Sequence, residues 1–143
     1  MTSHLPLVVG IGASAGGIPA LEGFFQQLPR DTGMAFVIVT HLSPNRHSLL
    51  DEVIARYTAS PVKIAEDGAE VRADTVYIMP EGKILTIADG KLRLRDDDPI
   101  QRERKPIDVF FASLADDQGE NAVGIVLSGG GGDGTLGVKA IKE

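Results

Sequence analysis

The sequence predicts an α/β protein with a doubly wound, mainly parallel sheet and a small antiparallel hairpin inserted in its middle. Apolar runs without polar alternation, typical of strands buried on both faces, lie at residues 6–11, 35–39 and 122–127. Segments with apolar residues at helical spacing separate them. Near residue 90, two strand-like runs are joined by Asp-Gly, a strong hairpin signal. Alternating strands and helices favour a parallel sheet with helices on both faces.

The first half of the chain predicts two strand–helix units. The helix after the first strand has Pro19 in its first turn, where proline is tolerated, and Pro29 as its stop. Its apolar positions recur every three or four residues: Ile18, Leu21, Phe24, Phe25 and Leu28. The second strand, 35–39, precedes an amphipathic helix marked by Leu49, Leu50, Val53, Ile54 and Tyr57. Both helices therefore present one apolar face to a sheet.

The second half predicts short strands, a helix and a last strand. Strand-like runs occupy residues 62–65, 75–80, 84–87 and 91–95. The last two runs are expected to pair antiparallel across Asp89-Gly90. Pro106 opens a helix that carries Ile107, Phe110, Phe111 and Leu114. After the strand at 122–127, a glycine-rich segment leads into a short final helix, expected at Thr135–Lys142.

Composition narrows the function classes. A chain of 143 residues, 43% hydrophobic and 24% charged, fits one soluble domain with a single core. Its net charge of −6, without a basic stripe, argues against nucleic-acid binding. Apolar runs are shorter than the ~18 residues that a membrane span needs. The absence of cysteine excludes disulfides and thiolate catalysis and fits a cytoplasmic location.

Three unusual clusters follow the carboxyl ends of predicted strands: Gly12–Gly17, Thr40–Asn45 and Ser128–Gly134. In open α/β sheets, ligands bind beyond the carboxyl ends of the strands, where the strand order reverses. The shared location of the clusters predicts one functional site.

Ser14 is the candidate nucleophile of this site. It lies in Gly12-Ala13-Ser14-Ala15-Gly16, which matches G-x-S-x-G between a strand and a helix. Small neighbours leave the hydroxyl clear and let backbone N–H groups face a developing oxyanion. The rival interpretation is a phosphate-binding turn, because Gly10, Gly12 and Gly16 resemble a loosened dinucleotide fingerprint. This cluster alone does not separate the two.

His41 favours the nucleophile. A dinucleotide site would place an acidic residue at the end of the second strand to hold the ribose. This strand instead ends in His41, and the next acid, Asp51, falls inside the following helix. A histidine at that strand end is placed to act as a general base for Ser14. Asp133, in the third cluster, is the natural carboxylate to orient the imidazole. The order Ser, His, Asp differs from that of the α/β-hydrolases.

The sequence resembles the catalytic domain of the chemotaxis protein-glutamate methylesterases, the CheB type, along nearly its whole length. The matching stretches are Gly10–Gly17, Thr40–Asn45, Thr75–Pro80, Pro106–Ala115 and Gly124–Gly137. The resemblance implies that Ser14, His41 and Asp133 form a catalytic triad. It implies hydrolysis of γ-glutamyl methyl esters on cytoplasmic chemoreceptor helices, often with deamidation of receptor glutamines, and no metal or cofactor.

The chain departs from this family pattern at several positions. Ala15 replaces a common Thr, Gly130 and Gly132 replace a Met and a polar residue, and a His often found near the hairpin is replaced around Ile84. The residues of these motifs are most similar to those of family members that are fused to a receptor methyltransferase. We also expect that residues 1–143 lack the last strand and helix of the domain. The alternatives are a nucleotide-binding module and a non-catalytic regulatory domain with the same fold.

Overall fold

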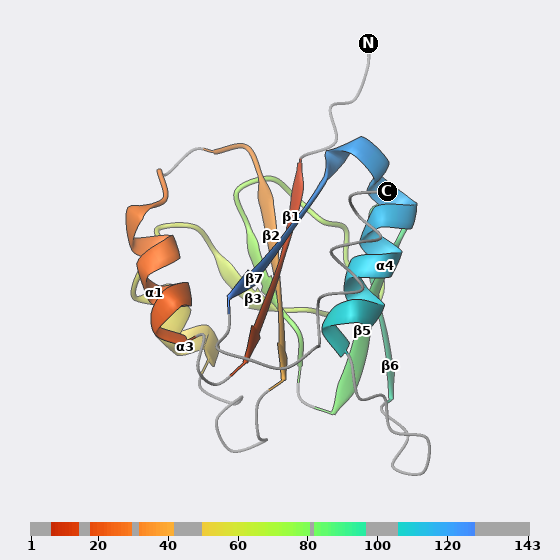
Figure 1. The fold of residues 1–143 in the computed structure, drawn as a ribbon, viewed down its shortest axis with the longest axis horizontal. Coiled ribbons are helices and arrows are strands. Elements are labelled where there is room, and N and C mark those ends of the chain that lie inside the picture. The colour runs from red at the N-terminus through yellow and green to blue at the C-terminus, as the bar shows by residue number, and fades with distance from the viewer. Residues whose placement is uncertain are drawn as a thin grey trace.

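A five-stranded parallel sheet forms the centre of the molecule (Figure 1). The computed structural model describes residues 7–14, 18–29, 32–41, 50–80, 82–96 and 106–127. The strand order is β3-β4-β2-β1-β7. The strands are β1 (Val8–Ser14), β2 (Ala35–His41), β3 (Val62–Ile64), β4 (Val76–Ile78) and β7 (Ala122–Leu127). The chain thus winds from β1 outward past β2 and returns on the other side of β1 as β7.

Helices cover both faces of this sheet (Figure 1). On one face lie α1 (Ile18–Gln27) and α3 (Leu50–Ala55). On the other lies α4 (Pro106–Gln118), followed by a 3₁₀ turn at Gly119–Asn121. Beside α4 is the antiparallel hairpin of β5 (Lys83–Ala88) and β6 (Lys91–Asp96). The doubly wound fold and the hairpin insertion are confirmed.

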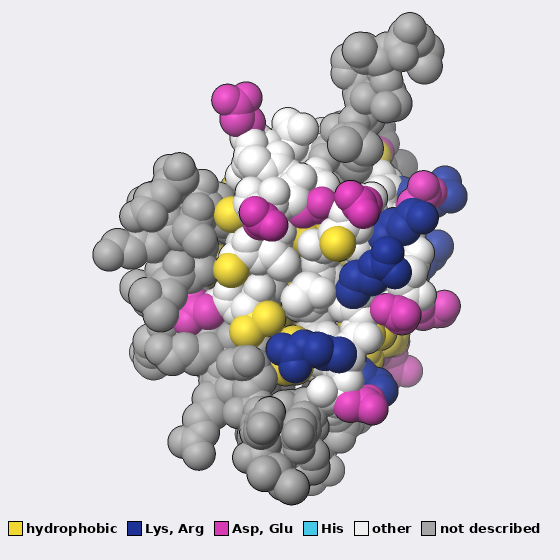
Figure 2. Space-filling model, turned by 90° about the vertical axis from the view of Figure 1, so that its right-hand side faces the viewer, with side chains coloured by type: hydrophobic (Ala, Val, Ile, Leu, Met, Phe, Trp, Pro, Cys, Tyr) yellow, Lys and Arg dark blue, Asp and Glu magenta, His cyan; other side chains and the backbone are white. Residues whose placement is uncertain are grey.

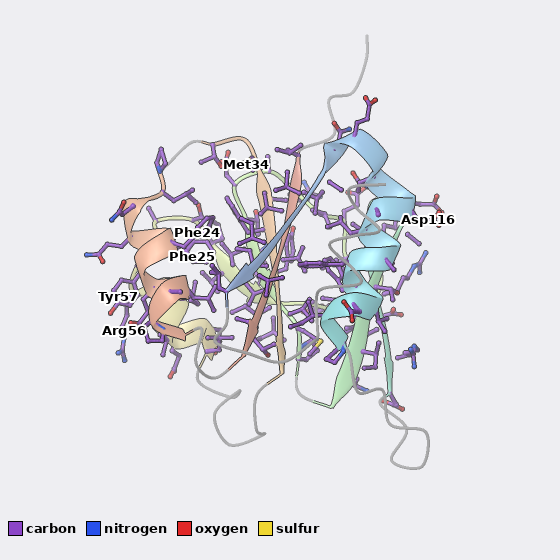
Figure 3. The ribbon with its side chains drawn as sticks, in the orientation of Figure 1. Phe24, Phe25, Met34, Arg56, Tyr57 and Asp116 are labelled. Atoms are coloured by element: carbon purple, nitrogen blue, oxygen red, sulfur yellow. The ribbon has the colours of Figure 1, made fainter. Side chains whose placement is uncertain are left out.

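The core has two parts, one on each face of the sheet. Alternate β1 residues divide between them: Val9, Ile11 and Ala13 pack with α1 and α3, whereas Val8 packs with α4 and the hairpin. In the first part, Phe24 and Phe25 lie between α1 and the sheet (Figure 3). The rings of Phe25 and Phe36 meet edge to face at 5.6 Å. The strands are therefore buried on both faces, which explains their unbroken apolar runs.

Both β1 and β2 extend further than the apolar runs predict. β1 continues through the expected glycine turn to Ser14, and β2 continues to His41. The cause is the parallel ladder, which pairs the two strands from Val8 with Ala35 to Ser14 with His41. Residues 62–64 and 76–78 also join this sheet. The second helix ends earlier than expected, because the N–H groups of residues 56 and 57 bond to carbonyls three residues back. The predicted helix Thr135–Lys142 lies outside the described residues.

Two glycines of β1 let α4 approach the sheet closely. A Cβ placed on Gly12 would lie 2.5 Å from Cγ2 of Ile107, and one on Gly10 would lie 3.0 Å from side-chain atoms of Leu114 and Phe111. Real Cβ atoms do not approach neighbours to 2.5 Å, so the helix could not keep this position over a larger residue at 12. The glycines at 10 and 12 thus serve packing within a strand.

The hairpin is fastened to α4 by two side chains of the helix. At the turn, Asp89 and Gly90 have φ values of 54° and 72°, as a two-residue type I′ turn requires. Their N–H groups donate to the two carboxylate oxygens of Asp117, at 2.6 and 3.0 Å. One turn earlier on the helix, the hydroxyl of Ser113 accepts from the Ile87 N–H at 3.1 Å. The hairpin and α4 therefore form one unit.

Replacing Gly12 with alanine should destabilise the fold. Because the added methyl group meets Ile107, Gly12→Ala should lower the free energy of unfolding by about 1–3 kcal/mol, measured in urea. In the double variant Gly12→Ala/Ile107→Ala, the decrease in the free energy of unfolding should be smaller than the sum for the two single variants. The reason is that alanine at 107 leaves space for the methyl group added at 12.

Gly23→Ala is the matched control. Gly23 lies in α1, and a Cβ there would have no neighbour within 4 Å. This substitution should leave stability unchanged or raise it by up to about 1 kcal/mol, because alanine favours a helix over glycine. Equal stability of Gly12→Ala and the wild type would contradict the packing argument.

Asp117 should make stability depend on pH. Burial raises the pKa of its carboxyl, but hydrogen bonds from the Gly90 N–H, the Gln118 amide and the Asp89 N–H outweigh burial and hold that pKa below its ordinary value. A group with a depressed folded-state pKa stabilises the fold above its unfolded pKa, ~3.9 for aspartate, and loses this effect as the pH falls.

The stability difference between the wild type and Asp117→Asn should therefore be full near neutral pH and shrink as the pH falls below about 4. Urea unfolding across this range measures it. Asp116→Asn is the control, since Asp116 is an exposed neighbour on α4 (Figure 3). A difference that stays constant down to pH 2–3 would refute the role of the Asp117 carboxylate.

Candidate active site

The ends of β1 and β2 bring two predicted site residues together. Ser14 and His41 are the last residues of these neighbouring strands, and the parallel ladder pairs them with each other. Neighbouring strands lie about 4.8 Å apart, so the two backbone positions are about that far from each other. Both lie at the carboxyl edge of the sheet, the lower edge in Figure 1. The structure thus sets the backbone positions of Ser14 and His41 side by side at one edge of the sheet.

The third predicted residue, Asp133, lies outside the described residues. The strand that precedes it, β7, ends at Leu127, which is paired with Ala13 on the other side of β1. The sheet therefore reverses its winding direction at β1, with β2 on one side and β7 on the other. This is the topological switch point, where open α/β sheets bind their ligands.

Two helices begin at the same edge. α1 starts at Ile18, shortly after Ser14. α4 starts at Pro106, and its next residue, Ile107, packs at the level of Gly12. The N-terminus of a helix carries partial positive charge and N–H groups without partners inside the helix. The edge that carries Ser14 thus has an electrostatic environment that favours negative charge on a bound oxygen atom.

Two polar residues are buried at this edge, which the sequence does not predict. Thr40, which precedes His41 and pairs with Ala13, is 3% exposed, and its hydroxyl has no hydrogen-bond partner within the described ranges. Asp108, the third residue of α4, is 9% exposed. An acid shortly after a helix-opening proline is a common helix-start feature, so the sequence alone does not set Asp108 apart. Burial is the signal that does.

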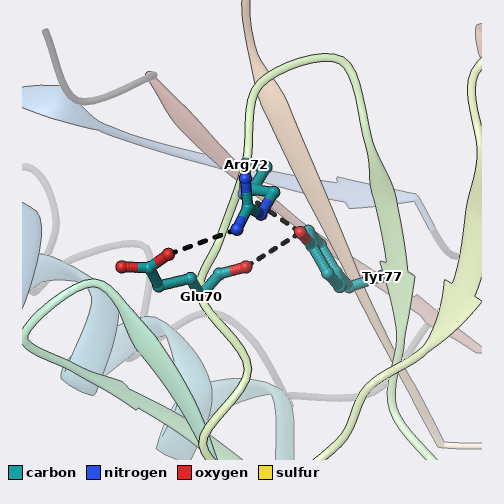
Figure 4. Close-up of polar contacts among 3 residues, drawn as sticks. All are labelled: Glu70, Arg72 and Tyr77. Atoms are coloured by element: carbon teal, nitrogen blue, oxygen red, sulfur yellow. Dashed lines mark hydrogen bonds and ion pairs between the residues drawn. The ribbon is translucent and has the colours of Figure 1, made fainter.

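A surface cavity of about 550 Å³ lies elsewhere, next to the edge strand β3. The hydroxyl of Tyr77 orders one wall: it donates to the carbonyl of Glu70 and accepts from the N–H of Arg72, both at 3.0 Å (Figure 4). An ion pair of 3.5 Å joins the same Arg72 and Glu70 side chains. Tyr77 is level with Val37, four register positions before His41. The cavity is therefore separate from the edge that carries Ser14.

The described residues show neither a metal-binding cluster nor a membrane-spanning helix. Among them, no group of three or more His, Asp or Glu side chains comes together in a way that could hold a metal ion. No described helix is long and apolar enough to cross a membrane.

The chain is similar to known proteins along nearly its whole length. The sequence model of the CheB methylesterase family matches residues 9–143. A protein-glutamate methylesterase/protein-glutamine glutaminase of Pectobacterium atrosepticum is 37% identical over 98% of this chain and 42% of that protein. A protein of the same name from Salmonella typhimurium is 35% identical over 95% of this chain and 40% of that protein. The chain thus spans about two fifths of the length of these relatives.

A solved structure shares the fold. The crystal structure of the Thermotoga maritima CheB methylesterase catalytic domain matches with a TM-score of 0.81 at 28% identity, over 97% of this chain and 76% of that one. The family match covers residues 9–143, most of the chain. The chain belongs to the CheB methylesterase family.

Proposed function

We propose that the chain hydrolyses methyl esters on glutamate side chains of chemoreceptors. The observation that carries the proposal is the register pair of Ser14 and His41 at the carboxyl edge, beside the switch point of the sheet. A serine and a histidine in contact are the minimal pair for nucleophilic acyl transfer. The reaction named for the relatives, ester hydrolysis on glutamate, is an acyl transfer of this kind.

The proposed reaction has two steps. The Ser14 hydroxyl attacks the ester carbonyl carbon while His41 takes its proton. His41 then gives this proton to the departing methoxide, so that methanol leaves and the glutamyl group stays on Ser14. Water, deprotonated by His41, attacks this acyl-enzyme. His41 then gives this proton to the Ser14 oxygen as free glutamate leaves. In this proposal Asp133 accepts a hydrogen bond from the imidazole, fixes its tautomer and stabilises its positive charge.

The helix N-termini support the step in which negative charge develops. Each tetrahedral intermediate carries an oxyanion, and backbone N–H groups between Ser14 and the start of α1 are the proposed donors. The positive ends of α1 and α4 add a favourable field at the edge. No metal or cofactor takes part in this mechanism.

The same machinery would accept a glutamine side chain, with ammonia leaving in place of methanol. The relatives' name, which includes glutaminase, supports this second activity. The proposed partners are the cytoplasmic helices of methylated chemoreceptors and a fused or associated methyltransferase. The proposed location of the chain is the cytoplasm. The expected strand and helix beyond Glu143 stay a prediction.

Removal of the nucleophile should abolish turnover. Ser14→Ala should lower the rate of methanol release from methylated receptor by a factor on the order of 10⁴ or more. Ser60→Ala, between α3 and β3, is the matched control and should keep wild-type activity. Circular dichroism establishes that both variants are folded. A folded Ser14→Ala protein with near-normal turnover would rule out the assignment.

A double variant tests whether Ser14 and His41 act as a unit. Ser14→Ala/His41→Ala should be no slower than either single variant, because the histidine has no role without the nucleophile. If the fold-decreases in activity of the two single variants multiplied in the double variant, Ser14 and His41 would act independently. That result would contradict their action as a pair.

His41 as the base should give a rising pH profile. An unprotonated imidazole is needed to take the serine proton, so kcat/KM should rise with pH through a single ionisation that belongs to His41. The profile of kcat/KM between pH 5 and 8, with the small residual activity of His41→Ala as comparison, measures this. A flat wild-type profile, or the same ionisation in His41→Ala, would count against the role of His41.

A further inference from the structure

The outer face of the hairpin carries a row of positive side chains. Lys91, Arg93 and Arg95 alternate along β6 with Leu92 and Leu94. All three cations are exposed, whereas Leu92 is fully buried against α4 and the sheet. Figure 2 shows this side of the molecule, with Lys and Arg side chains along one part of it and Asp and Glu side chains beside them. We call Lys91, Arg93 and Arg95 the basic row.

The basic row contrasts with the charge of the whole chain. Residues 83–96 carry four basic and two acidic side chains, a charge of +2 in a chain of −6. One of these acids, Asp96, is paired with Lys83. The cross-strand neighbours of the row on β5 (Ala88, Thr86 and Ile84) are uncharged. The Asp67 carboxylate accepts a hydrogen bond from the N–H of Leu94, between Arg93 and Arg95 in the sequence. Period-two alternation places these three cations on one face, although apolar residues separate them in the sequence.

The row is presented on a rigid support. On one side of the hairpin, Ser113 and Asp117 of α4 hold β5 and the turn. On the other side, Leu92 exchanges backbone hydrogen bonds with Gly68 and Ala69, at 2.7 and 2.8 Å. Glu70, opposite Lys91 in an isolated bridge, is already paired with Arg72. Little conformational entropy is therefore left to lose in the backbone when a ligand binds to this face.

The row leads toward the edge that carries Ser14. The hairpin turn is bound to Asp117 near the end of α4, whereas α4 begins beside Gly12 at the carboxyl edge. The open end of the hairpin, at Lys83 and Asp96, follows soon after the carboxyl end of β4 at Ile78. Arg95 thus lies at the end of the row nearest that edge, and Lys91 lies at the far end.

We propose that the basic row docks a negatively charged, glutamate-rich helix of the protein substrate. This inference rests on the proposed function, which places glutamate side chains and their methyl esters on the substrate. Alternate residues of a strand are about 6.6–6.8 Å apart, and successive turns of a helix are about 5.4 Å apart, so the cations can meet acidic side chains on successive helical turns. Opposite charge speeds encounter and sets the orientation of the bound helix.

Binding of a labelled peptide tests the row directly. The probe is a helical peptide rich in glutamate, and its Kd is measured by fluorescence anisotropy at low salt. Arg93→Gln should raise the Kd roughly 2- to 5-fold, and Lys91→Gln/Arg93→Gln should raise it further. The difference should vanish at about 1 M salt, where the Debye length falls to about 3 Å. The same peptide with glutamine in place of glutamate should bind weakly to all variants.

Arg56→Gln is the matched control, because Arg56 is exposed after α3, on the opposite side of the sheet (Figure 3). It removes the same charge and should leave the Kd unchanged. Equal Kd values for Arg93→Gln and Arg56→Gln would overturn the proposal. So would self-association of the wild type that Arg93→Gln abolishes without affecting peptide binding, since this face would then contact a second copy.

Turnover separates this inference from the proposed function. With a methyl-esterified form of the peptide, Arg93→Gln should raise KM and leave kcat nearly unchanged. With a small neutral glutamate methyl ester, it should match the wild type. A wild type that hydrolyses neither ester would refute the proposed function, whereas the Kd comparison would still decide the docking. Equal slowing on both esters would show damage to the fold and contradict the docking role.

Discussion

The close contact between α4 and β1 is the constraint on which the rest of the structure depends. Glycine at positions 10 and 12 removes the side chains that would hold the helix away, and Ile107 fills the space above Gly12. This contact sets the height of α4 over the sheet and brings its positive end to the edge where Ser14 lies. The same helix then carries Ser113 and Asp117, which fasten the hairpin. Packing, the electrostatics of the edge and the position of the hairpin all follow from one contact.

Much of this architecture can be predicted from local patterns. Buried strands and amphipathic helices have strong signatures, and Asp89-Gly90 specifies a turn with two positive φ values. The carboxyl-edge location of Ser14 and His41 follows from where the apolar runs end. Their pairing in register agrees with the expectation that they meet, although their chemical roles stay a prediction.

Other features depend on long-range contacts and could not be predicted. The glycine-rich segment that begins at Gly12 suggests a turn, yet β1 continues to Ser14 because β2 supplies a partner for every position up to His41. The Asp117 carboxylate reaches N–H groups 27 and 28 residues away in the sequence. The burial of Asp108 and Thr40 depends on the placement of α4 and the neighbouring strands. Patterns within short segments of one sequence do not reveal such contacts between distant residues.

The hairpin also bears on how the protein avoids aggregation. A two-stranded sheet has two edges, each of which could add a strand from another molecule. Here the Ile87 N–H on one edge is occupied by Ser113, and Leu92 on the other edge is bonded to the chain at Gly68 and Ala69. Intermolecular strand addition would first have to break these bonds. The hairpin can therefore expose the basic row to solvent without adding strands from other molecules at its edges.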